Sequence, residues 1–369
     1  MEIKSDRLVA QINLKNIKHN LMQYKDAIQN KKIKYLAVIK ADAYGHGASE
    51  VAKYLQNDVD YFAVATSDEA LELRKSEVEN EVLLLGVPFT DELDSLIIND
   101  ITLSVGSLSV AKEISLAAEK LGKTAKVHIK LDTGMSRLGF LDYEDYVSEV
   151  KEVSGLSNVE ITGVYSHFAE AENKDDSFTK SQNKLFVNMC DNIRNAGVDL
   201  GVRHIANSSG ALFPDYSYDM VRIGIGLYGY DICRKMSEMD LKPAMRLTAR
   251  TIAVKKLQKG RTVGYGRTYK TESDEYIQTI SIGYADGLSR HISGKDFPVH
   301  YADGNTGVLV GNVCMDQAMV KTSKPVDVGT EAYIFGYDKI SGELLAKYAD
   351  TIIYEILTGI KRVKRVYIK

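Results

Sequence analysis

Cysteine is scarce in this 369-residue chain, which has only Cys190, Cys233 and Cys314. Their number is odd and they lie far apart, so the sequence predicts neither a disulfide framework nor a zinc or other metal site. No apolar stretch approaches membrane-spanning length, and the N-terminus lacks a basic-then-apolar signal segment. We therefore expect a soluble, cytoplasmic protein with no membrane partner.

Positive charge is not in excess. The chain has 47 Lys and Arg residues against 50 Asp and Glu residues, and it contains no long basic run. This balance argues against nucleic acid as a partner. The length allows a large core and suggests two domains.

Short apolar runs alternate with segments of helical pattern up to about residue 245. We interpret eight runs as strands: Tyr35–Lys40, Tyr61–Thr66, Glu81–Gly86, Ile101–Val105, Lys126–Asp132, Ile161–Phe168, Arg203–Ser208 and Met220–Ile225. Segments between them, such as 67–76 and 109–121, have amphipathic helical spacing. This alternation predicts an α/β fold, a (β/α)8 TIM-like barrel over residues 15–245. A doubly wound sheet is the alternative, because the third and fourth runs are the least distinct.

After about Met245 the pattern changes to strand-like segments rich in Val, Ile, Thr and Tyr. We interpret four of them as strands: Arg246–Leu257, Tyr276–Ile282, Gly307–Val313 and Glu331–Gly336. The sequence thus predicts a mostly β C-terminal domain over residues 246–369. The opening segment Arg7–Leu14 also alternates like a strand.

Lys40 ends the first apolar run and is followed by a Gly-containing segment, residues 41–48, that indicates a turn into a helix. Burial at a strand tip would lower the pKa of Lys40 and leave a nucleophilic amine near neutrality. Such an amine suits a Schiff-base lysine. The same position also suits a solvated lysine at a strand end.

The string Val38–Gly47 closely resembles the pyridoxal-phosphate (PLP) lysine motif of alanine racemases, and similar strings recur in order up to Tyr354–Thr358. The resemblance covers nearly the whole chain. It implies a PLP-dependent isomerase of the fold-type III barrel family that interconverts L- and D-alanine by a two-base mechanism and supplies D-alanine for peptidoglycan. It also implies that residues 1–14 associate with the β-domain.

PLP carries a phosphate, which barrels often bind with the loops after strands seven and eight. Small residues at 208–210 and 224–226 would let the backbone approach closely, although glycines there also suit tight turns. The phosphate ligands that the resemblance implies are Tyr44, Ser208, Gly224, Ile225 and Tyr354.

Arg222 is the most diagnostic residue of the resemblance, which places it at the pyridine nitrogen. A guanidinium stays charged and only donates hydrogen bonds, so it would weaken the electron sink that a carboxylate partner strengthens. The resemblance places His167 and His204 in the network around Arg222 and the catalytic tyrosine.

Racemisation needs two opposed acid/base groups. Lys40 can serve one face of Cα, and the resemblance assigns the other to Tyr265. A tyrosine with an ordinary pKa near 10 would need nearby cationic donors to act as a base.

The resemblance assigns the substrate carboxylate to Arg137, which can bind it with two hydrogen bonds. Lys130 stands where the family has a carbamylated lysine (N6-carboxylysine), which would turn a cation into an anion beside Arg137. Met315 and Asp316 would lie at the substrate and Tyr284 at the entrance. The family is a head-to-tail homodimer with shared active sites.

Two residues depart from the family pattern: Asn312 replaces a frequent arginine, and Glu172 a frequent aspartate. Both positions line the substrate corridor in the family. A serine-accepting or broader amino-acid racemase is therefore the close alternative, because packing discriminates weakly against one hydroxyl.

Two other PLP-binding classes share the barrel. Amino-acid decarboxylases typically have an acidic residue where Arg222 stands. The PLP-homeostasis binding protein lacks a β-domain such as the one that carries Tyr265 and Met315. Both features argue for a racemase.

Overall fold

The computed structural model describes residues 5–28, 32–173, 177–230, 233, 238–337 and 340–369. The chain forms two compact units. One comprises residues 16–43 and 47–242, and the other comprises residues 1–15, 44–46 and 243–369.

Eight parallel strands form the barrel of the first unit, in the order β10-β2-β3-β4-β5-β6-β8-β9. Their bounds are β2 Lys34–Val38, β3 Tyr61–Val64, β4 Glu81–Leu84, β5 Ile101–Val105, β6 Ala125–Asp132, β8 Val159–Tyr165, β9 Val202–His204 and β10 Met220–Ile223. Backbone hydrogen bonds from Asp219 to Arg203 and from Arg222 to Ala206 link the β10 and β9 segments, which are the two ends of this order. Each strand overlaps one of the eight predicted runs, so the TIM-like barrel is confirmed and the doubly wound sheet is wrong.

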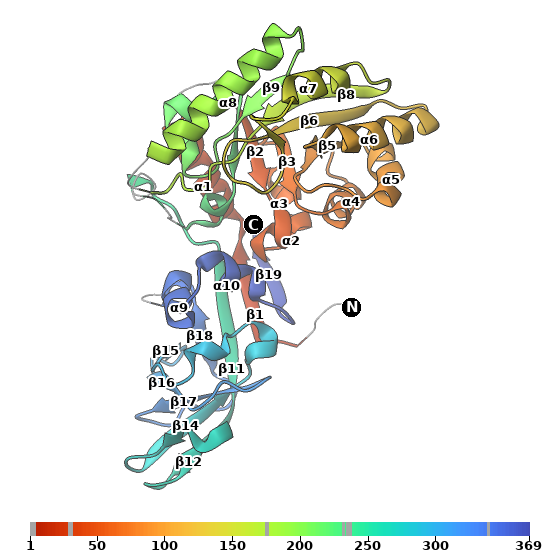
Figure 1. The fold of residues 1–369 in the computed structure, drawn as a ribbon. Coiled ribbons are helices and arrows are strands. Elements are labelled where there is room, and N and C mark those ends of the chain that lie inside the picture. The colour runs from red at the N-terminus through yellow and green to blue at the C-terminus, as the bar shows by residue number, and fades with distance from the viewer. Residues whose placement is uncertain (1–4, 29–31, 174–176, 231–232, 234–237, 338–339) are drawn as a thin grey trace. The chain divides into compact units, whose positions relative to one another are not determined.

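Helices surround the barrel strands (Figure 1). They are α1 Leu14–Ala27, α3 Ala48–Leu55, α4 Ser67–Lys75, α5 Leu93–Ile98, α6 Leu108–Leu121, α7 Tyr146–Ser154 and α8 Ser177–Asn195. Helix α4 begins with a capping box, in which Thr66 and Glu69 accept each other's backbone N–H groups. Helix α6 begins after the Ser107 cap and ends at Gly122, whose φ of 62° suits glycine.

The other unit contains an eight-stranded sheet in the order β14-β17-β16-β15-β18-β11-β1-β19. The strands are β1 Leu8–Asn13, β11 Met245–Leu257, β14 Glu275–Ile280, β15 Pro298–Tyr301, β16 Thr306–Val310, β17 Ala318–Thr322, β18 Glu331–Phe335 and β19 Lys364–Ile368. Strand β1 lies between β11, to which it is antiparallel, and β19, to which it is parallel. Two helices, α9 Gly342–Ala349 and α10 Ile353–Gly359, complete this unit. The predicted mostly β C-terminal fold is confirmed.

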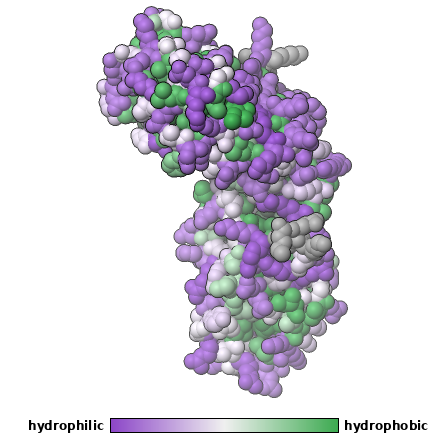
Figure 2. Space-filling model, turned by 90° about the vertical axis from the view of Figure 1, so that its right-hand side faces the viewer, coloured by the Kyte–Doolittle hydropathy of each residue, from purple (hydrophilic) through white to green (hydrophobic). Residues whose placement is uncertain are grey.

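The surface shown in Figure 2 is largely hydrophilic, with smaller hydrophobic areas between the polar side chains. Within the described parts of the chain, every helix is too short or too polar to cross a membrane.

Candidate active site

Lys40 lies two residues after the end of β2 and begins the short segment α2, Lys40–Tyr44. Burial lowers the pKa of its half-buried amine, and the positive charge of Arg137 lowers it further. The neutral form of Lys40 is therefore more accessible than that of a surface lysine.

The backbone after Lys40 is a left-handed turn, with φ of 52–54° from Ala41 to Ala43. Non-glycine residues in this region cost about 1–3 kcal/mol each, so the surrounding structure must hold them. The Glu69 carboxylate accepts the N–H groups of Ala41 and Asp42 at 2.5 and 3.3 Å. Helix α3 begins only at Ala48. The predicted turn into a helix thus exists, in an unusual left-handed form.

Arg222 on β10 is buried, and its terminal nitrogens form hydrogen bonds with groups at neighbouring strand ends. Nη1 donates to His204 Nδ1 at 2.8 Å, and Nη2 lies 3.0 Å from His167 Nδ1. Nη2 also donates to the carbonyls of Ser166 and Ile205, each at 2.9 Å. This geometry fixes the plane of the guanidinium.

The network keeps its charge on Arg222. Burial lowers the pKa of Arg222 to about 10, which still leaves it cationic at neutral pH. Burial and the Arg222 charge hold the pKa values of His167 and His204 well below the usual range, so both rings are neutral acceptors. Among the described residues, no carboxylate is hydrogen-bonded to Arg222.

Lys130 on β6 is buried beside the same network. Burial lowers its pKa to about 7 despite the nearby Asp132 carboxylate, with Arg222 and Arg137 adding to the shift. Its Nζ donates to the Leu131 carbonyl at 2.7 Å and lies 5.3 Å from the centroid of the Tyr165 ring. A substantial fraction of Lys130 is therefore a neutral amine at pH 7.

Asp132, which the sequence analysis did not single out, shapes the loop that carries Arg137. Its carboxylate accepts the N–H groups of Gly134, Ser136 and Arg137 at 2.9–3.0 Å. Burial opposes ionisation of Asp132, but these bonds and Lys130 lower its pKa on balance. An aspartate two residues before a glycine, whose N–H its side chain can accept, is a turn signal that could have identified this role.

Ser208 lies beyond the end of β9 and accepts the N–H groups of Gly224 and Gly226 at 2.8 and 3.4 Å. The adjacent Ser209 hydroxyl is buried and has no hydrogen-bond partner among the described residues. At Gly226 a Cβ would lie 2.2 Å from the Tyr24 hydroxyl, so only glycine fits. Because the Ser208 hydroxyl accepts these two bonds, its own proton is left to donate, and this donor beside the unsatisfied Ser209 hydroxyl fits an anionic group such as a phosphate.

The other unit contains the remaining candidate residues. Tyr44 is buried, and its ring centroid lies 5.9 Å from that of Tyr354 at the start of α10. Burial raises the pKa of Tyr44, so its hydroxyl keeps its proton and can donate.

Tyr265 lies in a tight turn between Gly264 and Gly266, whose φ values are 73° and 70°. Its side chain is 74 % exposed. The Asn312 amide donates to the Tyr265 carbonyl at 2.8 Å. The departure at Asn312 thus contacts the candidate catalytic tyrosine through its backbone.

Tyr284 and Met315 lie on two segments that are joined by backbone hydrogen bonds. Tyr284 N–H donates to the Cys314 carbonyl and Ala285 N–H to the Met315 carbonyl, both at 3.0 Å. Arg362, which sequence reasoning missed, pairs with Asp316 at 2.8 Å and with the buried Asp286 at 2.9 Å. These contacts hold the Tyr284 and Met315 segments together within this unit.

The candidate residues therefore fall into two groups. The barrel unit holds Lys40, Lys130, Arg137, His167, His204, Ser208, Arg222, Gly224 and Ile225. The other unit holds Tyr44, Tyr265, Tyr284, Met315, Asp316 and Tyr354.

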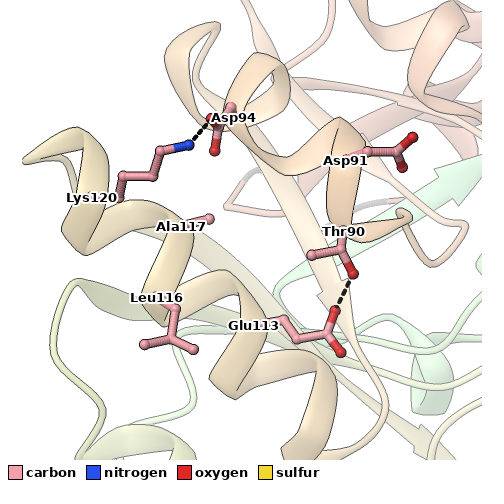
Figure 3. A pocket seen from close by; sticks show the side chains of 7 residues that line it. All are labelled: Thr90, Asp91, Asp94, Glu113, Leu116, Ala117 and Lys120. Carbon is pink, nitrogen blue, oxygen red and sulfur yellow. Dashed lines mark hydrogen bonds and ion pairs between the residues drawn. The ribbon is translucent and has the colours of Figure 1, made fainter.

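A cleft of about 340 Å³ lies on the barrel unit between α5 and α6 (Figure 3). Three of its charged groups have partners: Lys120 binds Asp94, and Glu113 accepts from Thr90, each at 2.7 Å. None of the candidate residues lines it. In the described part of the chain, no cluster of three or more His, Cys, Asp or Glu side chains could hold a metal ion.

Both parts of the chain match models of known protein domains. Residues 12–232 match alanine racemase, N-terminal domain, and residues 244–367 match alanine racemase, C-terminal domain. The fold and these matches define a two-domain barrel isomerase. The chain belongs to the alanine racemase family.

Relatives in this family match along the full chain. Alanine racemase 2 of Caldanaerobacter subterraneus subsp. tengcongensis is 38% identical over 100% of this chain and 96% of its own. The solved alanine racemase of Clostridium difficile 630 has a TM-score of 0.93 at 38% identity, covering 99% of this chain and 96% of that one. A solved histidine racemase from Leuconostoc mesenteroides subsp. sake has a TM-score of 0.87 at 29% identity, with 100% of both chains covered.

Proposed function

We propose that this protein interconverts L- and D-alanine with PLP as cofactor. The observation that carries the proposal is the buried Arg222, held by neutral histidines and backbone carbonyls, with no carboxylate bonded to it among the described residues. Relatives named alanine racemase favour alanine over the serine-accepting alternative. The proposed role is supply of D-alanine for peptidoglycan, in the cytoplasm.

The residues present fit PLP. Lys40 would bind it covalently, and Arg222 would donate to its ring nitrogen. The phosphate would be held by five residues: Tyr44, Ser208, Gly224, Ile225 and Tyr354. When bound, PLP withdraws electrons and makes the substrate Cα–H more acidic.

The chain's own residues would then bind the substrate and move the proton. Arg137 would hold the substrate carboxylate through two charge-assisted hydrogen bonds. The Lys40 amine would take or deliver a proton on one face of Cα, and the Tyr265 hydroxyl would act on the other. Met315, Asp316 and Tyr284 would border the substrate and its entrance.

Lys130 is proposed to be carbamylated. Its lowered pKa of about 7 supports this, because only a neutral amine attacks carbon dioxide. The new N–C bond yields a carbamate, and the amine loses a proton to solvent. The resulting anion would offset the positive charges of Arg137 and Arg222.

We also propose a head-to-tail homodimer with shared active sites. Tyr265, Tyr284 and Met315 are 74 %, 43 % and 54 % exposed in the chain, although each is assigned to the substrate. A partner chain that contributes these residues would place them against a barrel. In a two-fold dimer both sites would be built in the same way.

Chiral analysis tests the function. Purified protein is incubated with PLP and, separately, with L-alanine, L-serine and L-histidine, and the D-enantiomers are measured. We expect D-alanine to form fastest. The histidine arm is included because one structural neighbour is a histidine racemase; racemisation of a larger amino acid alone would contradict the proposal.

A further inference from the structure

A chain of hydrogen bonds leads from Arg222 into the barrel interior and ends at His128. His204 Nδ1 lies 2.8 Å from Arg222 Nη1, and His204 Nε2 lies 3.0 Å from His128 Nδ1. Both rings are fully buried. The proposed mechanism gives His128 no task.

The chemistry of the three groups fixes the direction of this chain. A guanidinium only donates, so His204 Nδ1 carries no proton and the neutral ring holds its proton on Nε2. That N–H donates to His128 Nδ1, which leaves the His128 proton on its own Nε2. If either ring were cationic, its Nδ1–H group would point at an N–H group of the neighbouring side chain, and the two donors would repel each other. Burial, followed by the Arg222 charge, lowers the pKa of His128 to about 3, which agrees with a neutral ring.

The Nε2–H group of His128, which is the last donor in this series of hydrogen bonds, has no acceptor among the described residues. His128 Nε2 is buried and unpaired among the described residues. The ring fills the space beside Gly163, its neighbour in the β6–β8 register, where a Cβ would lie 2.6 Å from it. An unpaired buried donor costs free energy, so stability alone does not account for a histidine here.

Tyr165 fixes the orientation of the middle ring. Its ring stacks on His204 with centroids 5.0 Å apart and planes 3° apart. Its hydroxyl lies 2.7 Å from the Ser104 hydroxyl, which donates to the Leu84 carbonyl. The stacked Tyr165 ring therefore fixes the orientation of the His204 ring. In this orientation Nδ1 of His204 faces Arg222 and Nε2 faces His128.

We propose that His128 is a positioning residue that holds Arg222 through His204. By accepting the His204 Nε2 proton, it keeps His204 Nδ1 free to accept from Arg222. Without that acceptor, the His204 proton can move to Nδ1, where it would face the Arg222 N–H. The inference rests on the proposed function only in that Arg222 is taken to contact the cofactor ring.

Two substitutions test this. In His128→Asn the side-chain carbonyl can still accept from His204, whereas His128→Phe fills the same space without an acceptor. Nitrogen NMR of ¹⁵N-histidine-labelled, full-length protein reports which ring nitrogen carries the proton. The His128 signals are identified by their loss in both variants, and the His204 signals by their loss in His204→Asn.

We expect Nε2–H tautomers for both rings in the native protein and in His204 of His128→Asn. In His128→Phe the His204 Nδ1–H form should appear. The kcat for L-alanine should fall about tenfold, as expected for one buried hydrogen bond, while KM changes little. His128→Asn should restore most of that kcat.

A native His204 protonated on Nδ1 would overturn the proposal, as would His128→Phe with native tautomers and kcat. If His128→Phe does not fold, Gly163→Ala replaces it, since the added methyl group must displace the His128 ring; native His204 signals there would also overturn the proposal. Failure of the protein to racemise any amino acid would refute the proposed function, yet the tautomers would still decide this inference.

Discussion

Three basic side chains in the barrel unit differ in how well their surroundings stabilise a positive charge. Arg222 keeps its charge because backbone carbonyls and neutral histidines surround its terminal nitrogens. Among the described residues, Lys40 and Lys130 have no comparable set of acceptors, and burial lowers the pKa of both amines. The barrel unit therefore combines one permanent cation with two amines that can be neutral, as the proposed nucleophile and the proposed carbamate precursor require.

Lys40→Ala should reduce racemisation by several orders of magnitude, because it removes both the covalent anchor and one acid/base group. Borohydride reduction of the native protein with PLP, followed by peptide mapping, should locate the cofactor on Lys40. Lys53→Ala, in the nearby helix α3, is the control and should retain activity. Labelling of a different lysine would refute the assignment.

Lys130 should make stability depend on pH. Its pKa is about 7 when folded and near 10.5 when unfolded, so the unfolded chain binds more protons between these values. The free energy of unfolding should therefore rise with pH from about 7 upward through this group.

Urea denaturation at pH 7 and pH 9, in buffer free of carbon dioxide, checks this. The rise should be smaller in Lys130→Met than in the native protein. Lys126→Met, on the same strand, should leave the rise unchanged, because ion pairs with Glu81 and Asp100 raise the pKa of Lys126 above that window. Equal slopes in native protein and Lys130→Met would contradict the prediction.

Arg222→Glu should slow racemisation and increase transamination. A carboxylate would keep the ring nitrogen of the cofactor protonated and strengthen the electron sink. Pyruvate formed from L-alanine, measured beside D-alanine, reports the change; Arg222→Lys keeps the charge and should form less pyruvate. An unchanged product ratio would indicate that Arg222 does not contact the ring.

At the level of elements, periodicity predicted the barrel strands because buried parallel strands are continuous apolar runs. It placed the ends of six strands two to four residues too late. The largest differences are at the runs that were predicted to end at Phe168 and Ser208, because β8 ends at Tyr165 and β9 at His204. In both places the backbone or side chain turns to bind Arg222 or Gly224, which are distant in sequence.

The turn after Lys40 was beyond sequence reasoning for a related reason. Ala41 and Ala43 disfavour a left-handed backbone because alanine pays a steric cost there, and Asp42 alone would not predict three consecutive residues in that region. The conformation depends on Glu69, which lies in a different element. The same carboxylate also accepts the N–H groups of Ala65 and Thr66.

Glu69→Gln should therefore destabilise the protein and loosen the Lys40 turn. A glutamine amide can accept through only one of its two ends, so two backbone N–H groups lose their acceptor, at a cost of about 1–3 kcal/mol. The midpoint of urea unfolding should fall, and so should PLP occupancy, measured by absorbance. Glu72→Gln, exposed on the same helix, should change neither. Native stability in Glu69→Gln would contradict this role.

At the level of the whole molecule, the candidate residues are distributed over both compact units. Motif strings identified residues whose types are tied to the chemistry, such as Lys40 and Tyr265. They did not identify Asp132, His128 or Arg362, because these residues act by holding others and their partners are set by tertiary pairing. Sequence strings also leave open whether Lys40 and Tyr265 serve one site in one chain or in two.

Mixing two inactive variants distinguishes these possibilities. Lys40→Ala lacks the barrel group and Tyr265→Phe lacks the β-domain group, so neither homodimer should racemise alanine. When equal amounts are unfolded together and refolded, half of the dimers are mixed. In a shared-site dimer each mixed molecule has one intact site of two, which gives about a quarter of native activity by symmetry. Native chains refolded in parallel control for yield. If each chain built its own site, the mixture would stay as inactive as its parents, and the head-to-tail arrangement would be wrong.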